Sequence, residues 1–131
     1  MERFVTAFAS EDGETLIDRH FGDSGFYSIY EISPLETVFK KAVENLTSVE
    51  EGVHADPGKA KGVAGLLREY GVQVVVSKVF GPNIQKIKQH FVCVMVSGES
   101  VQDSIVTVLE NFDTITIQWK KGETRDPVDL K

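Results

Sequence analysis

The side chains best suited to chemistry lie in the run Asp18-Arg19-His20-Phe21-Gly22. A neutral imidazole can coordinate a transition metal through a ring nitrogen, and a nearby glycine lets a ligand approach the backbone closely. The run separates two segments of β-type composition, so we predict a loop just past a strand, where ligands are commonly bound. His20 is therefore the first candidate metal ligand, against the plainer alternative that it only bonds to its own loop.

The other two histidines and the cysteine are weaker candidates. His54 precedes the first predicted helix and is a candidate second ligand, with plain exposure to solvent as the alternative. His90 is expected at the opposite edge of the fold and is set aside. Cys93 lies inside a hydrophobic strand pattern, where packing is the simpler role. Because it is the only cysteine, an intrachain disulfide and a CxxC metal site are both excluded.

Carboxylates in the first loops suggest an alternative to a histidine metal site, namely metal-dependent phosphoryl chemistry. Glu11, Asp12 and Asp18 lie in polar turns, whereas the predicted buried strands carry no inward carboxylate for a two-metal site. The chain has no nucleophile–base pair, P-loop or GxGxxG fingerprint. We interpret these acids as turn residues and keep a hydrolase only as a third alternative.

Composition narrows the class of protein. With 131 residues, 41% of them hydrophobic and 26% charged, the chain is expected to form one globular domain core. A net charge of −6 without a basic stripe argues against nucleic-acid binding. The apolar stretches are too short to cross a bilayer, and no basic start precedes one of them. We therefore expect a cytoplasmic protein with neither a nucleic-acid nor a membrane partner.

The first third of the chain reads as an antiparallel meander. Aromatic and β-branched residues predict strands over 4–9, 26–32 and 37–43, joined by turns. The adjacent Lys40 and Lys41 suit an exposed edge strand, where charge discourages pairing with another sheet.

The second half changes to a helical period. Asp56 as N-cap and Gly71 as C-cap enclose the first helix, and two apolar runs without alternation indicate strands covered on both faces. The predicted elements are helices at 57–70, 84–87 and 101–112 and strands at 72–76 and 91–96. This order predicts an α/β fold with right-handed crossovers and helices on both faces of the sheet.

The tail has a different pattern. Ile115, Ile117 and Trp119 alternate with polar residues, which predicts an extra C-terminal strand over 113–119. Such a strand should pair with a sheet edge, either within the chain or in a second copy, so monomer and homodimer both stay open. Residues 120–131 are expected to fray. We therefore divide the chain into a domain of residues 1–112 and an extension of residues 113–131.

The predicted strand directions bring four loops to one edge of the sheet. Strands one, three, four and five should point the same way, and ligands bind outside the carboxyl ends of such strands. Helices also begin there, with N-termini that favour anions. Arg19, Lys59, Lys61 and Lys78 are close enough in sequence to add positive charge. We predict an electropositive rim that suits a compact, multiply charged anion.

Several short motifs, in a consistent order over residues 1–112, resemble the dinitrogenase iron–molybdenum cofactor biosynthesis family, of the NifX, NafY and NifB C-terminal type. The matching segments are His20-Phe21-Gly22, the aromatic strand 26–30, Gly58-Lys59 with Gly62, residues 71–76, Gly81-Pro82-Asn83, strand 92–96 and Ser100-Val101.

The resemblance implies a three-layer α/β/α, ribonuclease H-like fold without nuclease activity, with a mixed five-stranded sheet in the order 3-2-1-4-5. It implies a non-enzymatic carrier for an iron–sulfur or iron–molybdenum cofactor, related to nitrogen fixation and working with donor or acceptor proteins. His20 would be the metal ligand. The cofactor-binding residues would be Arg19, His20, Phe21, Gly22, His54, Gly58, Lys59, Gly81, Pro82 and Asn83. The alternative is a regulatory or protein-interaction module of the same fold, which binds a small anion or a partner and no metal cluster.

Overall fold

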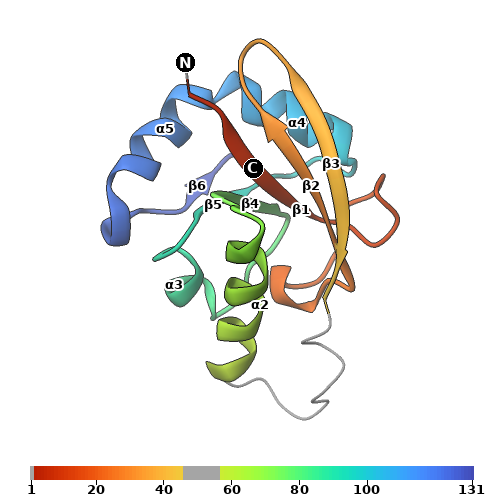
Figure 1. Cartoon of the computed structure of the whole chain (residues 1–131), viewed down its shortest axis with the longest axis vertical. Helices are drawn as coiled ribbons and strands as arrows, with labels where there is room; N and C mark the ends of the chain where they lie inside the picture. The colour runs from red at the N-terminus through yellow and green to blue at the C-terminus, as the bar shows by residue number, and fades with distance from the viewer. Residues whose placement is uncertain (1, 46–56) are drawn as a thin grey trace.

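A six-stranded mixed sheet in the order β3-β2-β1-β4-β5-β6 forms the centre of the protein (Figure 1). The computed structural model describes residues 2–45 and 57–131, with side-chain surroundings in the second range given from residue 62 onward. The strands are β1 (Phe4–Ala9), β2 (Phe26–Ile32), β3 (Thr37–Glu44), β4 (Val74–Ser77), β5 (Val92–Met95) and β6 (Val128–Asp129). β2 is antiparallel to β1 and β3, whereas β1, β4, β5 and β6 are mutually parallel.

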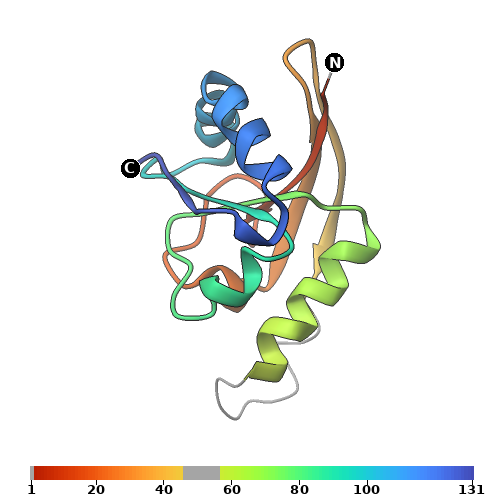
Figure 2. The ribbon, with the colours of Figure 1, turned by 90° about the vertical axis from the view of Figure 1, so that its left-hand side faces the viewer.

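Helices cover both faces of this sheet, which makes the three-layer α/β/α fold (Figure 2). The helices are α2 (Pro57–Glu69), α3 (Ile84–Ile87), α4 (Val101–Glu110) and α5 (Phe112–Lys120), with 3-10 turns η1 (Phe21–Asp23) and η2 (Gly122–Thr124). α2 and α3 pack on one face, and α4 and α5 on the other. The predicted α/β class and the order 3-2-1-4-5 are confirmed, with β6 added at the end.

The apolar run of β4 is explained by burial on both faces. Val75 packs in the cluster on the α2 side, while Val74 and Val76 pack in the cluster on the α4 side, and all three are 0% exposed. A strand covered on both faces needs no polar alternation. Cys93 of β5 is also 0% exposed on the α2 side, and burial raises the pKa of its thiol to about 12. Its predicted packing role is confirmed.

Cap residues mark two of the helix boundaries, while Asp56, the predicted N-cap of α2, lies outside the described residues. Gly71, at φ +75°, follows α2 and ends it. The amides of Gly71 and Val72 donate hydrogen bonds to carbonyls of the last helical turn. At the start of α4 the Ser100 hydroxyl accepts a hydrogen bond from the Asp103 amide at 3.0 Å.

The predicted strand over 113–119 is wrong, because these residues belong to helix α5. The alternating β-branched residues indicate a strand, but Phe112, Ile115 and Trp119 are also spaced by three and four positions, as on one face of a helix. Burial decides between the two patterns: Ile115 is 0% exposed, whereas Ile117 is 58% exposed. The preceding helix ends at Glu110, two residues earlier than predicted.

The extra C-terminal strand exists, but it lies further along the chain. β6 pairs in parallel with β5, with Val128 opposite Val94, so the added strand belongs to the same chain. The expectation that residues 120–131 fray is wrong, because Arg125 is 6% and Val128 is 7% exposed. The extension closes the second hydrophobic cluster over the α4 face of the sheet.

A pair of isoleucine variants tests the helical assignment of α5. Ile115→Ala should lower the free energy of unfolding by about 2–5 kcal/mol, because it leaves a cavity in the core. Ile117→Ala should change it by less than about 0.5 kcal/mol, because that side chain is exposed. Urea unfolding followed by circular dichroism measures both. Equal large losses would instead support the strand, which would put both side chains on one face.

Candidate functional site at the carboxyl edge of the sheet

The loops that follow β1, β4 and β5 meet at one edge of the sheet, as the strand directions predict. The Phe21 amide donates to the Val79 carbonyl at 2.9 Å, which joins the loop after β1 to the loop after β4. The Leu16 amide donates to the Glu99 carbonyl at 2.9 Å, which joins the same loop to the one after β5. The first loop is therefore tied on both sides by main-chain bonds.

Phe21 anchors the loop that carries His20. Its side chain is 0% exposed, and its ring stacks on Phe80 at 5.2 Å and contacts Tyr27 at 4.9 Å between centroids. The ring fills the core beneath the loop, so it is not exposed at the surface, and a contact between Phe21 and a cofactor stays a prediction. Its effect is to hold His20, the preceding residue, at a fixed position on the surface.

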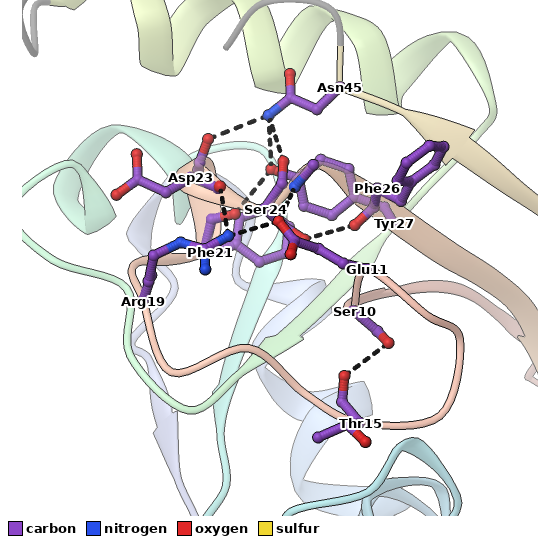
Figure 3. A network of polar contacts seen from close by, with 12 residues as sticks. Ser10, Glu11, Thr15, Arg19, Phe21, Asp23, Ser24, Phe26, Tyr27 and Asn45 are labelled. Carbon is purple, nitrogen blue, oxygen red and sulfur yellow. Dashed lines mark hydrogen bonds and ion pairs between the residues drawn. The ribbon is translucent and has the colours of Figure 1, made fainter.

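A buried amide fastens this loop to the end of β3 (Figure 3). Asn45 is 1% exposed, and its Nδ2 lies 3.1 Å from the Gly22 carbonyl, 2.9 Å from the Ser24 carbonyl and 3.3 Å from the Tyr27 hydroxyl. The Tyr27 hydroxyl in turn donates to the Phe21 carbonyl at 2.7 Å. The turn after His20 thus has polar support from two strands.

Asn45 carries no signal in the sequence that marks it as part of the site. An asparagine just after a strand is an ordinary turn residue, and only the topology brings it beside residues 22–27. Burial, with a smaller contribution from the Asp23 carboxylate, raises the pKa of Tyr27 well above its ordinary value. The phenol therefore stays protonated at neutral pH and remains a hydrogen-bond donor.

His20 lies directly against Gly81, the residue that turns the chain before α3. Gly81 has φ +74°, and an added Cβ would lie 2.5 Å from His20 Nδ1 and 2.7 Å from both Cγ and Cε1. Only glycine allows this approach. Because these three ring atoms are almost equally near the added Cβ, the flat face of the imidazole lies against Gly81. The imidazole is exposed and forms no hydrogen bond or ion pair within the part of the chain that is described.

The predicted electropositive rim is wrong for the two of its cations that are described. Arg19 Nη2 bonds to Glu11 Oε2 at 2.5 Å, and Lys78 Nζ bonds to Asp18 and, at 2.8 Å, to Glu99. Three neighbouring carboxylates therefore compensate both cations. Arg19 and Lys78 do lie near this edge, but the same loops also carry Glu11, Asp18 and Glu99. These carboxylates form ion pairs with the two cations and so cancel the predicted positive charge.

The α4 N-terminus also has partners from the chain itself. The Val101 amide donates to the Glu14 carbonyl at 2.9 Å, and the Ser100 cap satisfies the Asp103 amide. Asp12 supports the adjoining turn, because its Oδ1 accepts from the Glu14 and Thr15 amides at 2.8 Å each. These bonds hold the pKa of Asp12 below its ordinary value, as expected for a turn carboxylate.

The remaining predicted site residues fall into three groups. His54 lies outside the described residues. Gly58 and Lys59 lie in the first turn of α2, and their side-chain surroundings are likewise outside the described part, as are those of Lys61. The others surround His20 and Gly81 along the chain: Gly22 in η1, and Pro82 and Asn83 before α3. Within residues 2–45 and 62–131, no three or more His, Cys, Asp or Glu side chains are placed to hold a metal ion.

These features define a three-layer α/β/α domain with an accessible imidazole, that of His20, held at the carboxyl edge of its sheet. The family model for dinitrogenase iron-molybdenum cofactor matches residues 2–111 of the chain. The protein therefore belongs to this family, which links it to the binding or biosynthesis of iron–molybdenum cofactor. A comparison with curated proteins found no match. None of the helices that the structure describes has the length and apolar character needed to cross a membrane.

Two glycine variants test the contact between His20 and Gly81. Both Gly81→Ala and Gly71→Ala should lower the free energy of unfolding by about 1–2 kcal/mol, because each puts a side chain at positive φ. Only Gly81→Ala should displace the imidazole, since nothing lies within 4 Å of an added Cβ at Gly71. Chemical shifts of the His20 ring in NMR spectra measure the difference. Unchanged His20 shifts in folded Gly81→Ala protein would contradict the contact.

Proposed function

We propose that this protein is a non-enzymatic carrier for an iron–sulfur or iron–molybdenum type cluster. The cargo is held at the carboxyl edge of the sheet, with a ring nitrogen of His20 as the protein ligand to a metal of the cluster. Family membership supports the class of cargo. The observation that carries the proposal is an exposed imidazole, with no hydrogen-bond partner among the described residues, that is packed against Gly81.

The surroundings of His20 suit binding followed by release. Phe21 and Asn45 hold the loop in place, so little order has to be gained when a cluster binds. A neutral imidazole coordinates iron directly. With one firm ligand from the described part of the chain, an acceptor protein has few bonds to replace. His54 is a candidate second ligand in this proposal.

The ion pairs of the rim bear on how a cluster would be retained. Arg19 and Lys78 are compensated by carboxylates, so coordination by His20 contributes more to affinity than their charge does. In this proposal the site around the imidazole is lined by residues of the neighbouring loops, namely Arg19, Gly22, Gly81, Pro82 and Asn83. Gly58 and Lys59 of α2 complete it. We place this exchange in the cytoplasm, between donor and acceptor proteins of cofactor assembly.

The same ion pairs favour a second candidate function. Because carboxylates of the same loops pair with Arg19 and Lys78, this edge attracts an anionic cluster less strongly. A weaker attraction for a cluster fits a regulatory or protein-interaction module of the same fold. Such a module would bind a partner or a small anion and no metal. Cluster binding distinguishes the two functions.

The test uses three histidine variants of the full chain. After anaerobic reconstitution with iron and sulfide, wild-type protein should show cluster absorbance and bound iron. His20→Ala should weaken cluster binding by about tenfold or more, since even residues behind a ligand contribute factors of about 10–100. His90→Ala is the matched control, because His90 lies at the opposite edge and should leave iron binding unchanged.

The His54→Ala variant measures the second ligand. A partial loss of bound iron would assign His54 to the site, and no loss would remove it. Thermal unfolding of each variant checks that the fold is kept. Equal iron binding by wild-type protein and folded His20→Ala would overturn the ligand role, and absence of cluster from wild-type protein would favour the interaction module.

A further inference from the structure

A pocket lies at the edge of the sheet opposite His20, where β4 and β5 begin. Its volume is about 460 Å³. Gln73 precedes β4 and His90 precedes β5, so this is the amino edge, away from His20. The rest of the pocket comes from the end of α2 and from the extension after residue 111, which the family match does not include. Its polar and aromatic lining consists of Arg68, Gln73, Gln89, His90, Trp119, Glu123 and Arg125.

Arg125 is the buried charge of this pocket. It is 6% exposed, and its guanidinium lies over the Trp119 ring at 4.2 Å from the centroid. Nη1 donates to the Gln89 carbonyl at 3.0 Å and Nη2 to the Trp119 carbonyl at 3.1 Å, while Nε has no partner among the described residues. The first bond joins the segment after α5 to the chain leaving α3, and the second joins it to the end of α5. Figure 2 shows the backbones of these segments close to α3.

No carboxylate of the described residues forms an ion pair with Arg125. A buried cation without a counter-ion is costly, and two carbonyl bonds use only two of the five guanidinium N–H groups. The uncompensated charge is therefore a feature that a bound anion would satisfy.

The charges around Arg125 are mostly positive. Arg68 and Arg125 line the pocket together with a single carboxylate, the exposed Glu123, so the lining carries a net charge of +1 when His90 is neutral. Burial lowers the pKa of His90, and the Arg68 and Arg125 charges lower it further against the opposing effect of Glu123. The imidazole thus experiences the positive field of both arginines.

We infer that this pocket binds a small oxyanion, with a phosphate or carboxylate group held between Arg68 and Arg125 and hydrogen-bonded by His90. Guanidinium groups present paired N–H donors that match the oxygens of either group. The volume lies within the range of small-molecule sites, about 300–1,000 Å³. Trp119, Glu123 and Arg125 lie beyond the family match, so the matched domain alone does not complete this pocket. The inference does not depend on the carrier role of His20.

Trp119 makes the inference directly testable, because it is the only tryptophan of the chain and lies in the pocket. The full chain is titrated with inorganic phosphate, and separately with succinate, at constant ionic strength balanced with chloride. Tryptophan fluorescence should change and saturate with at least one of these probes. Chloride alone should give no saturating change.

Arg68→Ala is the informative variant, because Arg68 is exposed and its loss should not disturb the fold. It should weaken binding about tenfold, the equivalent of one charge-assisted contact. Arg3→Ala is the matched control, since it removes the same charge from an exposed arginine outside this pocket and should leave the affinity unchanged. Arg125→Gln is not used alone, because the guanidinium also holds the tail.

NMR titration of the histidines provides a second readout. A bound anion should raise the pKa of His90, because a nearby negative charge favours the imidazolium, and should leave His20 unaffected. Saturation by phosphate only or by succinate only identifies the group that the pocket prefers. The inference is overturned if neither probe saturates, if chloride reproduces the change, or if Arg68→Ala binds as tightly as wild-type protein.

Discussion

The two-sided burial of β4 is the constraint on which the rest of this structure depends. Val75 points to one face of the sheet and Val74 and Val76 to the other, and all three are fully buried. Helices therefore cover the sheet from either side, and the segments that contain them connect parallel strands. The crossovers leave the sheet at the carboxyl edge and return at the amino edge. One edge therefore collects loops that start after strands, and the other collects segments that lead into them.

These two edges differ in how they treat charge. At the carboxyl edge, the loops neutralise their own cations: Lys78 is paired with Asp18 and Glu99 across two separate loops. At the amino edge, Arg125 is buried with carbonyl oxygens as its partners among the described residues. At the carboxyl edge ion pairs connect the loops to one another. At the amino edge the positive charge of Arg125 lies beside a pocket without a carboxylate partner among the described residues.

The sequence predicts most of the fold because its signals are local and agree with one another. Apolar patterns predict the first five strands, and a glycine after an apolar helical stripe predicts the cap at Gly71. The strand directions predict that the His20 and Gly81 loops meet at one edge. Ile115 shows where this fails: its neighbours fit both a period of two and a helical spacing, and only packing against the α4 side of the sheet decides. Asn45 lacks any local signal, because its bonds are made to residues about twenty positions away.

The burial of Cys93 has a consequence for redox behaviour. Its thiol is fully covered and its pKa is raised to about 12, so hardly any thiolate forms at neutral pH and oxidants have no access to it. Air oxidation should therefore neither cross-link copies of the chain nor consume this sulfur. An engineered surface cysteine would then be the sole reactive thiol, so the natural sequence already serves as the background for site-specific labelling and cross-linking.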